Sequence, residues 1–321
     1  MSYFLVSVSN KENLLLCKKY GLAGFTNSIN GLWTFSEIRI GDFVSFLYAA
    51  KAYNLYQVEN KTAFENAEKL PPWKPITFKI SRKTYSFPFR LNLKPIRFFE
   101  EPLIRIEFAY VAENLLLRGG YRKTHFQADQ TTLQNVSQMG IIYKENIEPL
   151  VLSNTKIFIP KFTLNNKNIK ISGVFPFREI ILQALMRQYL SEDNNLKKFL
   201  NMISIDKIDA ENLEVLGEKA LPEGHIDIFI KESVPIGLSR NIIVEVKTGK
   251  ATLNDFEQLK RYINETGDEC LKGVLIAKDF GKRTIKKIPD KIIPIKYSLE
   301  DFDKPKTFEE LKQKLKIEKI I

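Results

Sequence analysis

Three stretches in the second half of the chain decide its fold: Gly224-His225-Ile226-Asp227-Ile228, Ile243-Val244-Glu245-Val246-Lys247 and Gln258-Leu259-Lys260-Arg261-Tyr262. In the first two, apolar residues surround a few charges, which predicts two buried strands that form an antiparallel hairpin across residues 231–241. Side chains alternate along a strand, so Glu245 and Lys247 share one face while Val246 points to the other. A carboxylate and an amine are therefore expected side by side.

This arrangement predicts a metal site that acts on a phosphodiester. A hard divalent cation such as Mg²⁺ binds carboxylate oxygens, and a lysine beside them can orient a water molecule or steady charge on a phosphate. The competing interpretation of Glu245 and Lys247 is an ordinary solvated sheet face. Charges in a strand covered on both faces are costly unless they are paired or bound to a metal, and Asp227 interrupts a second apolar run.

With these residues the chain resembles the PD-(D/E)XK nuclease superfamily, in the branch related to the NucS-type mismatch endonucleases, over roughly residues 175–300. The resemblance implies a Mg²⁺-dependent endodeoxyribonuclease, with Mn²⁺ as a substitute ion. It implies that Asp227 and Glu245 bind the metal and that Lys247 positions or activates water. Gln258 falls on the family's helix glutamine and would support the site, with Tyr262 one turn further on.

The family also places a glutamate on the helix before the hairpin. Glu179 fits best, because it begins the segment 179–190, whose apolar residues have helical spacing. Glu192 is the competitor, since it lies closer to Asp227 in the chain. We expect Glu179 to complete the acidic cluster.

The remaining second half alternates helical and strand patterns. Thr252 and Asp255 resemble a capping pair before a helix. Strands are expected at 273–277 and 292–297, and the spacing of Phe308, Leu311, Leu315 and Ile317 predicts a short amphipathic helix. The order of elements predicts an α/β/α domain with a mixed sheet, which together with a β-rich first half gives an α+β protein.

The first half contains short aromatic-rich runs separated by Gly, Asn and Pro, as in a small β-rich domain. Candidate strands are 3–8, 42–48, 55–58, 85–93 and 103–108. With its early tryptophan, its Gly41-Asp42 turn and a late glycine-rich loop, the stretch resembles the PUA-like β-barrels of the EVE and YTH type over roughly residues 1–135. That resemblance implies recognition of a modified base flipped out of nucleic acid and held between aromatic rings.

The residues for such a base pocket follow from the same resemblance. Trp33 falls where YTH-like members place a cage tryptophan, and Trp73 is the candidate second wall. Asn27 and Ser28 are the candidates for reading the base edge. The alternatives are that both tryptophans fill the core and that Asn27 and Ser28 are ordinary loop residues.

A basic, glycine-containing loop is the candidate phosphate contact, since glycine lets the backbone approach a phosphate closely. Its candidate residues are Arg118, Gly119, Gly120, Arg122 and Lys123. The alternative is a plain tight turn. No Walker phosphate loop is present, because Gly249-Lys250 and Gly281-Lys282 lack the other motif residues. An ATP-driven motor is therefore not expected.

Composition agrees with a nucleic-acid partner. The 321 residues carry a net charge of +11, and the sequence pI near 9.3 favours an anionic partner. The only cysteines are Cys17 and Cys270, which lie far apart in sequence, so no disulfide is expected and the protein is expected in the reducing cytoplasm. The chain also has too few cysteines and histidines for a structural zinc site. No secretory or membrane-length apolar run is seen, so no membrane association is expected.

The expected organisation is a reading domain at 1–135, a partly ordered linker at 136–172 and a nuclease domain with a C-terminal helix at 173–321. It predicts a modification-dependent restriction endonuclease that cuts double-stranded DNA bearing a modified base. One alternative is a NucS-type repair enzyme for mismatched or branched DNA, and another is a non-catalytic nucleic-acid binder. Because one centre cuts one strand, double-strand cleavage would imply a homodimer or two visits.

Overall fold

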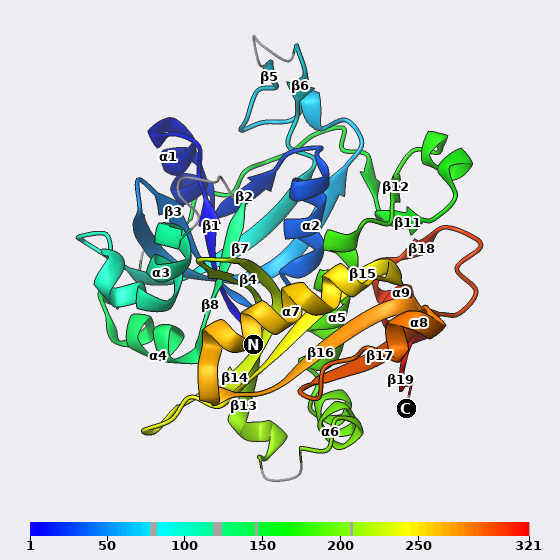
Figure 1. The fold of residues 1–321 in the computed structure, drawn as a ribbon. Coiled ribbons are helices and arrows are strands. Elements are labelled where there is room, and N and C mark those ends of the chain that lie inside the picture. Colours follow the sequence, from blue (N-terminus) through cyan, green and yellow to red (C-terminus); the bar gives the residue numbers. More distant parts are fainter. Residues whose placement is uncertain (78–81, 118–123, 145–146, 206–207, 321) are drawn as a thin grey trace. The chain divides into compact units, whose positions relative to one another are not determined.

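A computed structural model describes residues 1–77, 82–117, 124–144, 147–205 and 208–320 (Figure 1). The chain divides into two compact units. Met1–Leu115 and Gly119–Pro160 form unit 1, and Leu116–Arg118 and Lys161–Ile321 form unit 2. Both are built on a β-sheet accompanied by helices, so the protein is a mixed α+β protein with two main sheet regions.

Unit 1 is dominated by an eight-stranded sheet with the order β2-β7-β4-β3-β1-β8, to which β10 adds at β4 and β9 at β7. Its strands are β1 (Tyr3–Ser7), β2 (Leu22–Phe25), β3 (Phe43–Tyr48), β4 (Lys51–Phe64), β7 (Phe89–Phe98), β8 (His125–Ala128), β9 (Ile141–Ile142) and β10 (Ile157–Phe158), beside a separate hairpin of β5 (Ile76–Thr77) and β6 (Thr84–Tyr85). Its helices are α1 (Lys11–Tyr20), α2 (Ile29–Glu37), α3 (Ala109–Leu117) and α4 (Gln130–Gln138), with the 3₁₀ turns η1 (Ala67–Lys69) and η2 (Arg105–Phe108).

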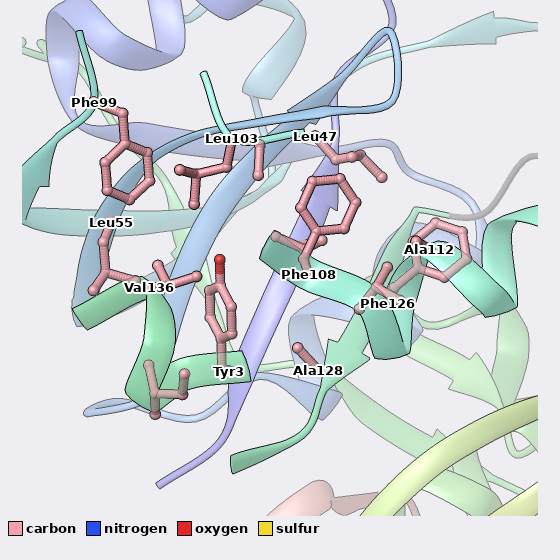
Figure 2. Close-up of a cluster of buried hydrophobic side chains, with 14 residues drawn as sticks. Tyr3, Leu47, Leu55, Phe99, Leu103, Phe108, Ala112, Phe126, Ala128 and Val136 are labelled. Atoms are coloured by element: carbon pink, nitrogen blue, oxygen red, sulfur yellow. The ribbon is translucent and has the colours of Figure 1, made fainter. Parts of the chain in front are cut away.

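One core cluster of unit 1 lies between this sheet and the helical segments η2, α3 and α4. Tyr3 and Leu5 of β1 pack with Phe108, Phe126 and other apolar side chains, all nearly inaccessible to solvent (Figure 2). The Tyr3 hydroxyl donates to Oγ of Ser45 at 2.8 Å, so the one polar atom of this ring is satisfied inside the core.

Two strand predictions for this unit are wrong in detail. In the predicted strand 103–108, Leu103 only bridges Ala52, and Arg105–Phe108 form the turn η2. Oε2 of Glu107 accepts a hydrogen bond from the backbone N–H of Ile104 and closes this turn. The expected strand 85–93 is broken between Tyr85 and Phe89. Pro88, which lacks a backbone N–H, lies in this break.

Unit 1 has the sheet expected of a PUA-like barrel, but among the described residues this sheet does not close into a barrel. The sheet begins at β2 and ends at β8, and within the described ranges no ladder joins these two edge strands. The β1–β3 pair is parallel and its other neighbours along the path are antiparallel.

Unit 2 contains a six-stranded mixed sheet with the order β13-β14-β15-β16-β17-β19, and a small sheet with the order β12-β11-β18. Its strands are β11 (Lys161–Thr163), β12 (Val174–Pro176), β13 (Leu213–Leu221), β14 (Gly224–Glu232), β15 (Asn241–Ala251), β16 (Cys270–Phe280), β17 (Ile292–Leu299), β18 (Lys306–Thr307) and β19 (Leu315–Lys319). Its helices are α5 (Glu179–Leu190), α6 (Asp193–Met202), α7 (Leu253–Thr266), α8 (Lys282–Ile285) and α9 (Phe308–Lys314), with the 3₁₀ turns η3 (Asn166–Lys170), η4 (Ala210–Asn212) and η5 (Gly267–Glu269).

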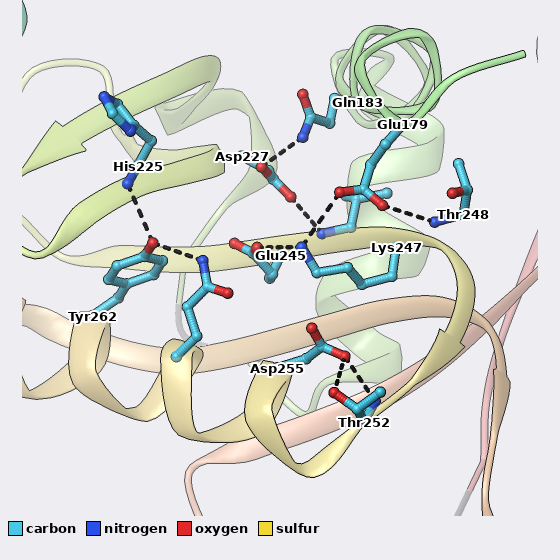
Figure 3. Close-up of polar contacts among 12 residues, drawn as sticks. Glu179, Gln183, His225, Asp227, Glu245, Lys247, Thr248, Thr252, Asp255 and Tyr262 are labelled. Atoms are coloured by element: carbon cyan, nitrogen blue, oxygen red, sulfur yellow. Dashed lines mark hydrogen bonds and ion pairs between the residues drawn. The ribbon is translucent and has the colours of Figure 1, made fainter. Parts of the chain in front are cut away.

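The four strands that the sequence predicts in unit 2 are present as β14, β15, β16 and β17, whereas β13 and the short strands β11, β12, β18 and β19 were not predicted. β14 and β15 make the antiparallel hairpin, whereas β15, β16 and β17 run parallel. Helix α7 starts with a capping box between Thr252 and Asp255, and it buries Phe256 and Leu259. Helices α5 and α7 lie on the two sides of β15 (Figure 3).

The predicted C-terminal helix is shorter than expected. It ends at Lys314, and Leu315 begins β19, which pairs antiparallel with β17. Pairing with β17 gives hydrogen-bond partners to the backbone of Leu315–Lys319, and Leu315 is still buried. The segment 136–172, expected to be a partly ordered linker, contains the end of α4 and the elements β9, β10, β11 and η3.

No helix in the described part of the chain is both long enough and apolar enough to cross a membrane.

Candidate active site

The candidate site lies where two strands of unit 2 part. The ladder between β14 and β15 has Ile228 opposite Val244 as its last pair. Asp227 and Glu245 are the next residues on the two strands, so both carboxylates stand at the mouth of a fork. Both are almost completely buried, with 8% and 1% of their surface exposed. Buried carboxylates at such a place need either a polar partner or a cation.

Asp227 is held from two directions. Its Oδ2 accepts the backbone N–H of Val246 at 2.8 Å, across the fork. Its Oδ1 accepts Nε2 of Gln183, in the second turn of α5, at 2.6 Å (Figure 3). The side chain is therefore fixed by the sheet on one side and by helix α5 on the other.

Lys247 joins the acids. Its Nζ lies 2.8 Å from Oε1 of Glu245 and 3.4 Å from Oε1 of Glu179. Glu179 is the first residue of α5, and its Oε2 accepts the backbone N–H of Thr248 at 3.2 Å. The structure thus brings together Asp227, Glu245, Lys247 and Glu179, as Figure 3 shows.

The electrostatics of this cluster are those of charges removed from water. Burial, reinforced by the charge of Glu245, raises the pKa of Asp227 well above its usual value. Burial likewise raises the pKa of Glu245. For Lys247 burial alone would lower the pKa, but the charges of Glu245 and Asp227 outweigh it and the pKa is raised. Lys247 is therefore an ammonium ion at neutral pH.

Helix α7 borders the site from its other side. Nε2 of Gln258 donates to the hydroxyl oxygen of Tyr262 at 2.8 Å, and that oxygen also accepts the backbone N–H of His225 at 3.2 Å. Gly224 has φ +151°, and a Cβ there would lie 2.5 Å from the Tyr262 hydroxyl, so only glycine permits this approach. Gln258 supports the edge of β14 through Tyr262.

The competing glutamate lies elsewhere. Glu192 precedes α6, accepts a hydrogen bond from Asn195 and pairs with Lys312 of α9 at 3.3 Å. Gln183 is the residue that sequence reasoning missed. Its only signal is its spacing of four from Glu179, which places both on one face of α5.

The oxygens present fit a hard divalent ion. Oε2 of Glu245 is buried and has no hydrogen-bond partner among the described residues. An orphaned carboxylate oxygen is expensive unless a cation or water meets it, and the neighbouring Asp227 supplies further oxygens of the type that Mg²⁺ prefers. The described residues contain no ready-made group of three or more Asp, Glu, His or Cys side chains arranged for a metal. Asp227 and Glu245 are therefore the candidate pair.

Unit 1 has a pocket of its own, with a volume of about 210 Å³. Its lining includes Trp73, Tyr85, Phe25 and Phe87. Trp73 is pressed against the backbone, because a Cβ added to Gly24 would lie 2.4 Å from its ring. The wall behind it is fixed by Arg90, whose guanidinium lies 5.1 Å and 5.4 Å from the ring centres of Phe64 and Trp73 and donates to the backbone oxygen of Leu70.

Of the predicted base-binding residues, only Trp73 lines this pocket. Trp33 is buried on α2, donates from Nε1 to Oε2 of Glu37 at 3.2 Å and packs edge-on against His125. Ser28 caps α2 by accepting the N–H of Gly31, and Asn27 accepts the N–H of Ser86. The predicted phosphate loop, Arg118, Gly119, Gly120, Arg122 and Lys123, lies outside the described residues.

One family model matches part of unit 2. Residues 192–306 match the family model of the endonuclease NucS C-terminal domain, so the chain carries a NucS-like endonuclease domain in unit 2. Glu179 and Gln183 precede the matched residues. No curated protein matches the chain.

Three solved structures are similar to parts of the chain. The EndoMS-dsDNA2 complex is 21% identical over 35% of this chain and 44% of its own, with a TM-score of 0.24. The DNA modification-dependent restriction endonuclease AspBHI is 12% identical over 92% of this chain and 75% of its own, with a TM-score of 0.20. The MspJI restriction endonuclease in complex with a 27-mer oligonucleotide is 9% identical over 90% of this chain and 64% of its own, with a TM-score of 0.20. The first match spans less than half of the EndoMS chain.

Proposed function

We propose that this protein is a divalent-metal-dependent DNA endonuclease whose unit 1 reads a modified base and whose unit 2 hydrolyses a phosphodiester bond. The observation that carries the nuclease part is the fork of β14 and β15, where two buried carboxylates meet one lysine. The match of residues 192–306 to a NucS nuclease domain supports it.

In this proposal Asp227 and Glu245 hold a Mg²⁺ or Mn²⁺ ion. The bound ion supplies Lewis-acid chemistry, because it polarises a phosphoryl oxygen and lowers the pKa of water. Lys247, fixed at 2.8 Å from Glu245, presents an ammonium group that orients the attacking water and stabilises negative charge on the phosphate. Glu179 and Gln183 are positioning residues: Glu179 positions Lys247, and Gln183 positions Asp227.

The reading function rests on the pocket of unit 1. A methyl group offers little to a hydrogen bond, so an apolar aromatic slot discriminates it by shape and stacking. Trp73, Tyr85 and Phe87 provide such a slot. The PUA-like assignment of unit 1 and the contribution of Arg118 and Arg122 to phosphate binding belong to this proposal.

The second candidate is a repair endonuclease of the NucS type that cuts mismatched or branched duplexes. It is favoured by the family match itself, which is to a NucS domain. Both candidates share the same centre in unit 2 and differ only in what unit 1 reads.

One experiment separates the two. Matched DNA duplexes that are unmodified, methylated at adenine, methylated at cytosine or mismatched are incubated with the protein and Mg²⁺, with Glu245→Ala as the inactive control. We expect cutting of a methylated duplex, loss of that preference in Trp73→Ala and its retention in Trp33→Phe. Preferential cutting of the mismatched duplex would instead establish the repair function, and equal activity of Glu245→Ala would refute the assigned centre.

A further inference from the structure

Unit 2 has a pocket at the carboxyl ends of its parallel strands, and the proposed mechanism does not use it. Its volume is about 380 Å³, within the range of about 300–1,000 Å³ that is usual for ligand sites. Phe177, Tyr297 and Phe302 form its aromatic side, with Phe177 and Phe302 packed edge-to-face at 5.2 Å. In open sheets with parallel strands this edge is the usual place for a ligand.

The other side of this pocket is cationic. Lys250, Lys278 and Lys296 line it, each from a different strand, together with Asp279, which lies 3.7 Å from Lys250. Three lysines against one aspartate leave a net charge of +2. Rings beside surplus positive charge suit a ligand that is flat at one end and anionic at the other.

The pocket shares a wall with the candidate active site. Thr248 lines the pocket, and its N–H donates to Glu179 of the site while its carbonyl accepts the Tyr297 hydroxyl at 3.1 Å. Lys247 and Lys296 stand in register through Ala277 of the strand between them. Two strand spacings separate them, about 10 Å, so a phosphate held at Lys296 is a near neighbour of one held at Lys247.

We infer that this pocket binds a nucleotide of the DNA substrate that is unstacked beside the phosphate being cut. Its base lies against Phe177, Tyr297 and Phe302, and its phosphate is held by Lys278 and Lys296. This inference rests on the proposed nuclease function and adds a specificity site next to the reaction centre. The ring faces accept any base, so the pocket selects for ease of unstacking rather than for sequence.

Gly249 allows a direct test, because it lines the pocket and a Cβ added there meets no heavy atom within 4 Å. Gly249→Phe adds a ring at the lining of the pocket, whereas Gly249→Ala adds a single methyl group to the same place. Losing one stacked base costs about five- to hundredfold, so Gly249→Phe should cut DNA at least about fivefold more slowly at subsaturating substrate. Gly249→Ala should lose much less activity than Gly249→Phe, and both variants should show the parent's circular dichroism.

A binding measurement decides the inference without relying on cleavage. Duplexes carrying 5-iododeoxyuridine at successive positions are photocrosslinked to the full chain in a Glu245→Gln background, and the crosslinked peptide is identified by mass spectrometry. We expect a crosslink to Tyr297 or Phe302 that disappears in Gly249→Phe and persists in Gly249→Ala. Crosslinking that avoids both rings, or that is unchanged by Gly249→Phe, would overturn the pocket assignment.

Charge reversal provides a second variant should Gly249→Phe fold poorly. Lys278→Glu at the pocket is compared with Lys198→Glu on α6, because both lysines are exposed and in unit 2. Only the first should weaken DNA binding and flatten its dependence on salt. If the parent chain cut no DNA at all, the nuclease proposal would fail, while the crosslinks would still show whether the pocket holds a base.

Discussion

Gln183 donates a hydrogen bond of 2.6 Å to Oδ1 of Asp227, while the other oxygen of that aspartate accepts the N–H of Val246. Helix α5 thereby fixes one ligand of the candidate metal site, although Gln183 lies outside the residues that match the nuclease family. A residue that hydrogen-bonds to a metal ligand orients it, and its loss commonly weakens metal binding or activity 10- to 100-fold.

Replacing Gln183 tests this role. Gln183→Leu keeps the size of the side chain but leaves Oδ1 of Asp227 without its donor. We expect a 10- to 100-fold loss of cleavage rate at saturating DNA, together with weaker metal binding by calorimetry, at about the usual cost of removing such a partner. The exposed Gln313→Leu on α9 is the matched control. Equal rates for the two variants would show that α5 has no positioning role.

Metal binding should depend on pH in a defined direction. Burial raises the pKa of Asp227 above 3.8 and that of Glu245 above 4.5. Protons compete with the cation for the same oxygens, so Mn²⁺ affinity should rise as pH increases above these ordinary values and level off above the raised pKa values. Calorimetry in buffers of different ionisation enthalpy would detect the released protons. A pH-independent affinity without proton release would contradict the assignment.

The same shift makes the metal-free fold sensitive to pH. In the folded state Asp227 keeps a proton that the unfolded chain has already lost, so the free energy of unfolding falls as pH rises from about 3.8 toward the raised pKa. Asp227→Asn has no such proton and can keep both hydrogen bonds if the Gln183 amide flips. In EDTA its Tm should exceed that of the parent by a margin that grows as pH rises from about 3.8 and levels off above the raised pKa of Asp227. A constant margin would mean that Asp227 is not the titrating group.

Lys247 should matter for the chemical step more than for DNA binding. Lys247→Met removes the ammonium beside Glu245 and should lower the single-turnover cleavage rate by about 10²- to 10³-fold. Lys260→Met, on the exposed side of α7, changes the same residue type outside the site. Gel-shift affinities of both variants should remain within a few-fold of the parent. A parallel loss of affinity and rate in Lys247→Met would point instead to a purely electrostatic DNA contact.

Much of unit 2 could be predicted from sequence because its signals are local. The apolar runs of β14 and β15 and the Thr252–Asp255 capping box each fix an element by neighbouring residues alone. The preference for Glu179 over Glu192 rested on helical spacing, and the structure places Glu179 at Lys247.

What the sequence did not indicate depends on contacts between distant segments. A glutamine on a helix is by default a surface residue, so Gln183 gave no sign of its contact with Asp227, 44 residues away. The sequence resemblance placed Trp33 as the cage tryptophan and Trp73 as the second wall. Only the fold shows that Trp33 contacts Glu37 and His125, whereas Trp73 lines a pocket.

The fork of β14 and β15 also separates two ends of one hairpin. The carboxylates stand at the open end, and residues 233–239 form the tip, six or more residues away along β14, which corresponds to about 20 Å. Val234, Ile236 and Leu238 at that tip are exposed, at 59%, 89% and 64%. A fluorophore or affinity peptide can therefore be inserted at the tip, where it would lie about 20 Å from Asp227 and Glu245 and leave both carboxylates unchanged.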